Sequence, residues 1–340
     1  MRGITFPGDR TVELTTFPDP TPGPGEVVLQ IKGSGMCGSD LHYYRRARDP
    51  NATPIIAGHE PCGVVVAVGS GVDGPTARVG ARVMVHHYHG CTDCQHCRSG
   101  WAQMCESVPV TVYGQNAHGA HAPYMKVPAS TLVPLDERLS FAAGAAISCG
   151  TGTAWGAIER MGLTGRDTIA IFGQGPVGLS ATMLAKAQGA RVIALDISET
   201  RLATATAFGA DFVVNLSLNT APEAIRELTG GRGSMMALET SGATQAGRDA
   251  LQSVRPWGTI CLVGLGSEAT LSVAAHLRLQ LRVMTSWTMS IQGQRACAEY
   301  VAERGLDLER LFTDRWTLDQ ANEAYASFDK QSGGKGVFLF

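Results

Sequence analysis

A glycine-rich segment between an apolar run and a helical pattern restricts the fold of this chain most. Residues Gly173–Gly178 read G-x-G-x-x-G, directly after the apolar run Thr168–Phe172 and at the start of the helical pattern Val177–Ala187. Glycines at these places permit a tight turn, close approach of a pyrophosphate and close packing of helix on strand. The segment therefore predicts a dinucleotide site at the first turn of an α/β domain, with a ligand-free glycine turn as the alternative.

The rest of the second half repeats this alternation of apolar runs and helical stretches. The further expected strands are Arg191–Leu195, Phe212–Val214, Met235–Leu238, Thr259–Val263 and Leu281–Thr285. Six strands with intervening helices predict a parallel, doubly wound sheet, which we expect over residues 149–288.

The first part of the chain has a different pattern. Short β-rich runs such as Glu26–Ile31 and Gly63–Val68 are separated by loops rich in Gly and Pro. This predicts a mainly antiparallel, barrel-like β domain over residues 1–148. The closing run Lys335–Phe340 reads as a strand, so we expect residues 289–340 to return to that first domain.

Four cysteines in the pattern C-x2-C-x2-C-x7-C predict a structural zinc site in a lobe at about residues 86–110. They are Cys91, Cys94, Cys97 and Cys105. Four thiolates close together suit a closed tetrahedral zinc site. An iron–sulfur cluster is disfavoured because its fourth cysteine would follow after three residues and precede a proline, whereas here the gap is seven and Glu106 follows. Disulfides would need an oxidising compartment.

Length and charge narrow the functional class. A chain of 340 residues with a net charge of −2 predicts two domains without a nucleic-acid or membrane surface. No apolar run is long enough for a bilayer, and Met1–Phe6 reads as a strand rather than a signal peptide. Nine cysteines fit a cytoplasmic protein. We expect Cys62, Cys261 and Cys297 to be small core residues.

Asp196, at the end of the second expected parallel strand, indicates which of the two nicotinamide cofactors, NAD or NADP, the protein binds. A carboxylate there can accept both ribose hydroxyls of the adenosine half and would repel a 2′-phosphate. Arg201 keeps a phosphate-binding alternative open, although it lies beyond the strand end. We therefore expect NAD rather than NADP.

Three further ligand candidates, Cys37, His59 and Cys149, stand far apart in the sequence. Each alone could be a buried thiol or a hydrogen-bonded loop histidine, and spacing cannot prove that they converge. Their surrounding motifs carry a resemblance. The motifs are Cys37–His42, Gly58–Glu60, the four-cysteine lobe, Cys149–Thr153 and the Gly173–Gly178 fingerprint.

In this order, and over nearly the whole chain, the motifs resemble those of the zinc-dependent alcohol dehydrogenases of the medium-chain dehydrogenase/reductase superfamily. The resemblance implies a GroES-like catalytic domain and a Rossmann domain that binds NAD(P). It implies a catalytic zinc on Cys37, His59 and Cys149, hence two zinc ions per chain. Glu60 matches an acid that can approach this metal, and Asp40 one that orients the imidazole of His59.

The resemblance also assigns a proton relay and the cofactor contacts. Ser39 and His42 match the relay, by which the proton of a zinc-bound alcohol reaches water before hydride passes to the nicotinamide. The expected cofactor-binding residues are Thr153, Gly173, Gly175, Pro176, Val177, Gly178, Asp196, Arg201, Ser241, Val263, Gly264, Ser286, Trp287 and Lys335. Lys335 is expected near the pyrophosphate.

Three residues bear on the substrate, an alcohol or its carbonyl. Polyol dehydrogenases commonly place Glu where this chain has Cys149, which favours the alcohol dehydrogenase branch and a secondary alcohol. His87 and His121 fall where relatives carry pocket walls, which would suit a polar or carboxylated substrate. The alternative is that the histidines from His86 to His89 only cover the zinc lobe with a solvated edge.

Other functions stay open beside an alcohol dehydrogenase. The first is a polyol or sugar-acid dehydrogenase of the same superfamily. The second is a non-catalytic zinc- and dinucleotide-binding protein. A zinc-free quinone or enoyl reductase is disfavoured because both metal sites look complete. We expect a homotetramer, with a dimer as the alternative.

Overall fold

The computed structural model describes residues 1–331 and 333–340 and divides into two compact units. The first unit contains Met1–Gly152 and Ser290–Phe340, and the second contains Thr153–Met289. The divisions lie within a few residues of the predicted ones, and helix α4 (Gly150–Met161) runs across the first of them.

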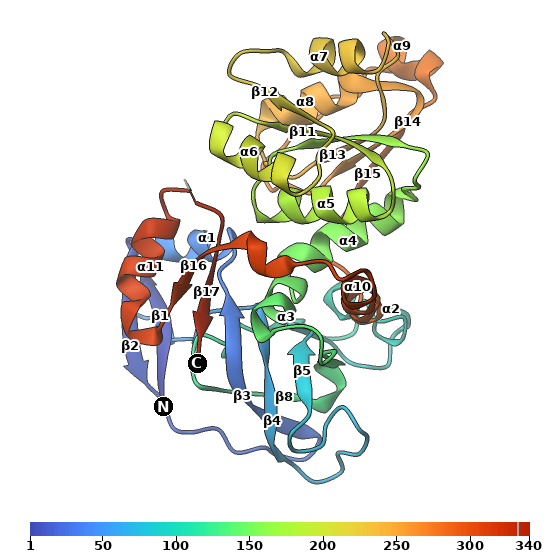
Figure 1. Ribbon diagram of the computed structural model, residues 1–340. Coiled ribbons are helices and arrows are strands. Elements are labelled where there is room, and N and C mark those ends of the chain that lie inside the picture. Colours follow the sequence, from blue (N-terminus) through green and yellow to red (C-terminus); the bar gives the residue numbers. More distant parts are fainter. Residues whose placement is uncertain (332) are drawn as a thin grey trace. The chain divides into compact units, whose positions relative to one another are not determined.

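The first unit is built on a seven-stranded, mainly antiparallel sheet with the order β16-β17-β3-β4-β5-β9, and β8 pairs with β3 (Figure 1). Its strands are β3 (Glu26–Gly35), β4 (Pro61–Val68), β5 (Arg82–Val85), β8 (Tyr124–Pro128), β9 (Leu132–Pro134), β16 (Phe312–Trp316) and β17 (Lys335–Leu339). The strands β1 (Arg2–Gly8) and β2 (Thr11–Thr16) form a hairpin, and β6 (Tyr88–His89) pairs with β7 (Thr111–Val112).

Five α-helices lie wholly in the described part of this unit: α1 (Asp40–Arg45), α2 (Gln95–Arg98), α3 (Phe141–Ile147), α10 (Ile291–Arg304) and α11 (Ala321–Phe328). One apolar core fills the barrel-like sheet, with Leu29, Val65 and Val127 fully buried. A second lies between the β1–β2 hairpin and α11, where Phe338 and Tyr325 are buried.

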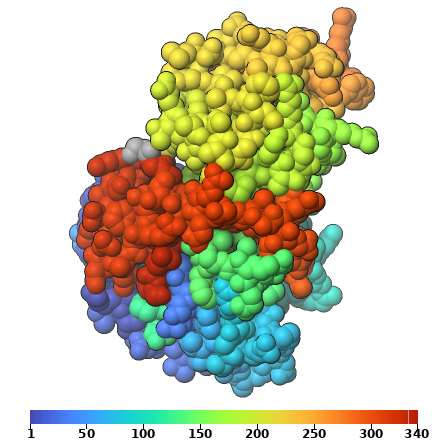
Figure 2. All heavy atoms as spheres, viewed as in Figure 1, coloured from blue at the N-terminus to red at the C-terminus, as the bar shows by residue number. Residues whose placement is uncertain are grey.

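The end of the chain is part of the first unit. Strand β17 pairs antiparallel with β3 through Val337 and Gly35, and parallel with β16. Figure 2 shows the C-terminal segment, in red, lying against blue and green parts of this unit. Two strands from the C-terminal part of the chain therefore belong to the main sheet of the first unit.

The second unit is a six-stranded parallel sheet with the order β12-β11-β10-β13-β14-β15. Its strands are β10 (Thr168–Phe172), β11 (Arg191–Asp196), β12 (Phe212–Asn215), β13 (Ser234–Glu239), β14 (Val254–Leu262) and β15 (Arg282–Thr285). The connecting helices are α5 (Pro176–Ala187), α6 (Glu199–Ala207), α7 (Ala221–Leu228), α8 (Thr244–Ser253) and α9 (Val273–His276). This is the strand order of a dinucleotide-binding doubly wound fold, so the predicted fold class is confirmed for both domains.

The central strands are continuous apolar runs because helices cover both faces of a parallel sheet. Ile169, Ile193 and Ile260, for example, are fully buried. Cys62, Cys261 and Cys297 are also fully buried, as expected for small core residues. None of the helices in residues 1–331 and 333–340 is both long and apolar enough to cross a membrane.

Candidate active site and cofactor site

The structure brings together the four-cysteine cluster in the first unit. The Sγ atoms of Cys91, Cys94, Cys97 and Cys105 all lie within 4.8 Å of one another. The Cys91–Cys97 and Cys94–Cys105 separations are 3.9 and 4.0 Å. Sulfurs on one tetrahedral zinc with bonds of about 2.3 Å would be about 3.8 Å apart. The cluster thus has the size of a site for one ion, and the distances are too long for disulfides.

Backbone amides favour the thiolate form in this cluster. The N–H groups of Cys94 and Asp93 donate to Cys91 Sγ at 3.2 and 3.4 Å, and they lower the pKa of Cys91 to about 6. Thiolates are the form that binds a metal. At Gly90, an added Cβ would come within 2.6 Å of Cys97 Sγ, so the turn into the cluster has room only for glycine.

A second cluster lies at the ends of three elements of the same unit. Cys37 follows β3, His59 and Glu60 precede β4, and Cys149 follows α3. One donor atom of each lies within 4.8 Å of those of the others. The sequence could not establish this convergence, because the residues are far apart along the chain. The geometry therefore groups Cys37, His59 and Cys149 with Glu60.

The two thiols of this cluster lie in contact with each other. Their Sγ atoms are 3.9 Å apart, again the spacing of two sulfurs on one zinc. Their mutual hydrogen bond lowers the pKa of Cys37 and raises that of Cys149. Two thiolates and an imidazole are a donor set that zinc prefers, and three protein ligands leave a fourth position for substrate. The residues present thus fit a catalytic zinc.

Asp40, at the start of α1, lies next to His59. His59 Nδ1 lies 2.9 Å from Asp40 Oδ1, and both side chains are buried. Burial lowers the pKa of His59, but the charges of Asp40 and Cys37 offset this and hold it well above the usual value. The contact favours a proton on Nδ1 and so leaves Nε2 to face the cluster.

The two relay candidates lie beside the cluster and at the surface. Ser39 Oγ is 3.2 Å from His59 Nε2 and 3.3 Å from Cys37 Sγ. His42 follows in α1, where its backbone N–H donates to the carbonyl of Ser39, and its side chain is exposed. The hydroxyl at the N-cap of α1 therefore lies next to the candidate metal ligands, and the imidazole within this short helix is exposed to water.

Glu60, a member of this cluster, forms a buried pair with Lys335. Lys335 Nζ lies 2.5 Å from Glu60 Oε2 and donates to the carbonyl of Met36 at 3.1 Å. Burial raises the pKa of Glu60 to about 8, although the Lys335 ammonium opposes the shift. Sequence reasoning did not find this pairing. The expected contact of Lys335 with a pyrophosphate stays a prediction.

His87 and His121 have different surroundings. The His87 ring centroid is 5.2 Å from that of His59, and Nδ1 lies 3.2 Å from the carbonyl oxygen of Ser148. Burial and the nearby charge of His59 lower the pKa of His87 well below its usual value. His121 is buried with both ring nitrogens engaged, by Ser34 and Tyr325, so it offers no free nitrogen to a substrate.

The alternative of a solvated histidine edge is wrong for two members of the run. His86 and His87 are each only 1% exposed. His86 Nδ1 lies 3.2 Å from Gln294 Oε1, on α10. The residues C-terminal to β5 turn into the core of the unit, and this turn buries both rings.

The glycine fingerprint in the second unit has the geometry that a dinucleotide needs. Gly173 has a φ of +86°. A Cβ at Gly178 would come 1.8 Å from the carbonyl oxygen of Gly173, so the helix packs closely on the strand. A Cβ at Gly175 would meet nothing within 4 Å. Gly175 is the N-cap residue of α5, which begins at Pro176. The space beside Gly175 therefore lies at a helix N-terminus, where a pyrophosphate can bind.

Asp196 ends β11 next to this loop. Its Oδ2 accepts the Gln174 N–H at 2.6 Å and its Oδ1 accepts the Ser198 N–H at 2.9 Å. Arg201 Nη1 is 3.9 Å from Oδ2. The carboxylate therefore holds the glycine loop and the start of α6 as well as standing where a ribose is expected.

The other expected cofactor residues of this unit, apart from Thr153 in α4, follow the carboxyl ends of parallel strands. They are Ser241 after β13, Val263 and Gly264 after β14, and Ser286 and Trp287 after β15. Glu239 at the end of β13, which sequence reasoning did not single out, holds the loop that carries Ser241: its Oε1 accepts from the N–H groups of Ser241 and Gly242 at 2.7 and 2.9 Å. Like Asp196, it is an acid at a strand end.

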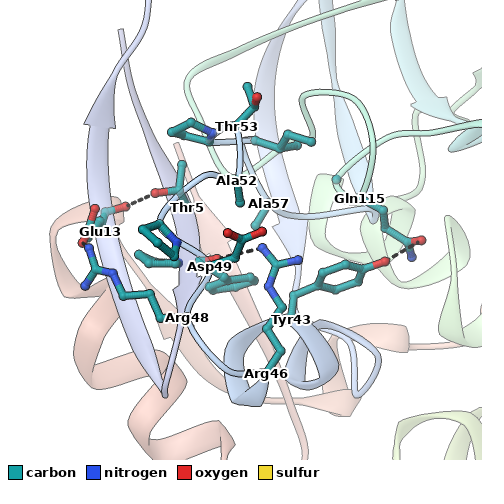
Figure 3. Close-up of a pocket in the computed structure, with 16 residues that line it drawn as sticks. Thr5, Glu13, Tyr43, Arg46, Arg48, Asp49, Ala52, Thr53, Ala57 and Gln115 are labelled. Atoms are coloured by element: carbon teal, nitrogen blue, oxygen red, sulfur yellow. Dashed lines mark hydrogen bonds and ion pairs between the residues drawn. The ribbon is translucent and has the colours of Figure 1, made fainter.

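A cavity of about 420 Å³ lies beside α1 in the first unit (Figure 3). Its charged and polar side chains are partly paired, since Arg48 contacts Glu13 at 3.2 Å and Tyr43 donates to Gln115 at 3.1 Å. The described residues that line it include no member of either metal-binding cluster. The cavity is therefore separate from both candidate metal sites.

Comparisons with known proteins show the family to which the chain belongs. The family described as alcohol dehydrogenase GroES-like domain matches residues 23–137, and the zinc-binding dehydrogenase family matches residues 176–303. The uncharacterized zinc-type alcohol dehydrogenase-like protein YphC of Escherichia coli is 38% identical over 100% of this chain and 99% of its own. The chain belongs to the zinc-dependent medium-chain dehydrogenase/reductase superfamily.

Two further relatives indicate the range of this superfamily. Sorbitol dehydrogenase of Bacillus subtilis is 33% identical over 95% of this chain and 92% of its own length. The solved structure of alcohol dehydrogenase TADH from Thermus sp. ATN1 has a TM-score of 0.92 and 28% identity, and it covers 100% of this chain and 99% of that one. The predicted family is therefore confirmed.

Proposed function

We propose that this protein is a zinc-dependent, NAD-linked dehydrogenase that interconverts an alcohol, preferably a secondary one, and its ketone or aldehyde. The convergence of Cys37, His59 and Cys149, with donor atoms within 4.8 Å of one another, carries the proposal. Zinc bound there would supply a Lewis acid for the substrate oxygen, and NAD would take up the hydride.

The chain's own residues orient the ligand and move the proton. Asp40 fixes the imidazole of His59 through the contact at Nδ1. Ser39 Oγ, next to His59 Nε2, is placed to pass on the proton of the substrate hydroxyl. His42 is exposed and can release a proton to water. Glu60 lies close enough to the thiolates to exchange for an oxygen ligand.

A polyol or sugar-acid dehydrogenase is the second candidate. The relationship to sorbitol dehydrogenase favours it. His87 favours it independently: if Nδ1–H donates to the Ser148 carbonyl, the neutral ring keeps an acceptor at Nε2 close to His59. Such an acceptor suits a second hydroxyl group.

Initial rates of NADH formation with simple secondary alcohols, polyols and sugar acids test these proposals. We expect turnover with at least one class, and the ratio of kcat/KM values selects between the two candidates. Zinc-loaded protein that binds NAD and oxidises none of these compounds would instead support a non-catalytic zinc- and dinucleotide-binding protein.

We further propose two zinc ions per chain that differ in lability. The four-cysteine site is closed, so its metal should resist chelators, whereas the site with an open position should lose zinc first, together with activity. Zinc release to a chromophoric chelator should therefore be biphasic, and activity should follow only the fast phase. One zinc or none in fully active protein would contradict this prediction.

For the cofactor we propose NAD, with Asp196 as the residue that reads the ribose. Asp196→Gly should raise the KM for NAD by about ten-fold, because hydrogen bonds to a charged group are worth roughly 1.5–3 kcal/mol. It should also reduce the preference for NAD over NADP, because the charge that repels a 2′-phosphate is removed. Asp196→Asn is the control, since it keeps an acceptor beside the Gln174 N–H without the charge. An unchanged NAD/NADP preference in Asp196→Gly would mean that another residue reads the ribose.

We propose a homotetramer, with a dimer as the alternative, and strand β15 supports an interface between copies of the chain. This strand is the outermost strand of its sheet, and Arg282, Val283 and Thr285 are exposed. The nearby side chains of Val273 and Leu277 are more than 60% exposed. An edge strand with apolar surroundings is a template for pairing with another chain.

We place the protein in the cytoplasm, because zinc-binding thiolates persist in a reducing compartment.

A further inference from the structure

We propose that Tyr325 and His121 are positioning residues that hold Asp40, and through it the ligand His59, in the geometry for metal binding. Four buried side chains lead away from the metal cluster. Asp40 Oδ2 accepts from Tyr325 OH at 3.2 Å, and Tyr325 OH lies 2.7 Å from His121 Nε2. His121 Nδ1 in turn lies 2.7 Å from Ser34 Oγ.

Only one arrangement of protons satisfies all these contacts. The carboxylate of Asp40 can only accept, so the single hydroxyl proton of Tyr325 points to it. The Tyr325 oxygen must then accept from His121 Nε2–H, which leaves Nδ1 to accept the Ser34 hydroxyl proton. Burial lowers the pKa of His121 to about 4, so its ring is neutral and carries one N–H at neutral pH. In this chain of hydrogen bonds, every donor lies on the side away from Asp40 and every acceptor on the side toward it.

Asp40 collects these donors on the side opposite its histidine contact. Oδ2 accepts from Tyr325 OH and, at 2.9 Å, from the backbone N–H of Cys37, while Oδ1 faces His59 Nδ1. One carboxylate thus joins the backbone of one metal ligand to the side chain of another. Without Tyr325, Oδ2 would keep one of its two donors and the carboxylate could rotate.

Packing fixes the hydroxyl of Tyr325 in place. The ring is fully buried and meets Phe6 edge-on at 4.6 Å between centroids, and it stacks near Phe338 at 6.2 Å. On the other side, His121 lies against Gly58, the residue before the ligand His59. A Cβ at Gly58 would come 2.4 Å from His121 Nδ1. The network therefore touches the segment that carries His59 as well as Asp40.

This inference rests on the proposed zinc site, and its test uses the two zincs of one molecule. Tyr325→Phe removes the hydroxyl and keeps the ring. Partners of metal-binding histidines are typically worth 10–100-fold in metal affinity. Tyr325 is one hydrogen bond further from the proposed zinc than Asp40, so we expect a smaller effect. Zinc release from the Cys37–His59–Cys149 site should be roughly 3- to 10-fold faster. Release from the four-cysteine site in the same molecule should not change.

The matched control is Tyr44→Phe. Tyr44 is a buried neighbour whose ring centroid lies 5.7 Å from that of Tyr325, but its hydroxyl makes no contact with Asp40 in the described residues. It should release both zincs at the rates of the unmodified protein. Thermal melting of each variant reports on folding separately.

A double-mutant cycle with Asp40→Asn separates positioning from general destabilisation. If Tyr325 acts through Asp40, Tyr325→Phe should have little further effect on zinc release once Asp40 is Asn. Additive effects, equal acceleration at both sites, or the same rates in Tyr325→Phe and Tyr44→Phe would overturn the inference. Failure of the unmodified protein to hold zinc on Cys37, His59 and Cys149 would refute the proposed function instead.

Discussion

Cys149→Ala is expected to abolish alcohol oxidation at every pH. The substitution removes one of two thiolates that lie 3.9 Å apart and leaves His59 and Cys37 with too few donors to retain zinc. A Lewis acid contributes several kcal/mol to the transition state, and about 4 kcal/mol corresponds to roughly a 10³-fold loss of kcat/KM. Zinc analysis should find the four-cysteine zinc retained and the other lost.

The control for Cys149→Ala is Cys62→Ala. Cys62 is fully buried, and burial raises the pKa of its thiol well above the usual value, so it stays an apolar core group. This variant should keep both zincs and its activity. If Cys149→Ala kept its full zinc content and rate, the assignment of Cys149 as a ligand would be wrong.

His42→Ala should slow alcohol oxidation mainly near and below neutral pH, by roughly 10²-fold at most. Both zincs and NAD affinity should stay nearly intact, because the side chain is exposed and belongs to neither metal cluster. Hydroxide replaces the missing base as the pH rises, so the deficit should shrink. Rate–pH profiles with and without added imidazole measure this, since a small base can replace the lost ring.

His276→Ala is the matched control for His42→Ala, because His276 is a partly exposed histidine on α9 whose ring bonds only to Ser272 among the described contacts. It should behave as the unmodified protein at every pH. A His42→Ala protein that is fully active at low pH, or as inactive as Cys149→Ala throughout, would contradict the relay.

The parts of the fold that follow local patterns could be predicted from the sequence. The strand Thr168–Phe172 has the predicted bounds, and the helix after the glycine loop begins only one residue earlier than expected. Local spacing likewise identified the Cys91–Cys105 cluster, since ligands a few residues apart meet without help from the rest of the fold. Convergence of Cys37 with Cys149 came only from the family resemblance.

Burial and distant partners could not be predicted in the same way. His121 was considered as a pocket residue because of its place in the sequence, but its partner Tyr325 lies 204 residues further along and belongs to no motif. The contact of Lys335 with a pyrophosphate stays a prediction, whereas the pairing of its ammonium with Glu60 in the interior was not predicted. From sequence alone, a lysine is predicted to be exposed, because lysines are rarely buried without an acidic partner and that partner is not visible in the sequence.

The first unit is assembled from both ends of the chain, and this sets the order in which its metal site can be completed during synthesis. A ribosome produces Cys37, His59 and Cys149 early, then the whole second unit, and only afterwards β16, α11 and β17. Until residues 312–340 emerge, β3 lacks its neighbour β17, Glu60 has no ammonium beside it, and Asp40 has no tyrosine. A nascent chain therefore carries all the ligands for zinc well before the groups that fix their geometry.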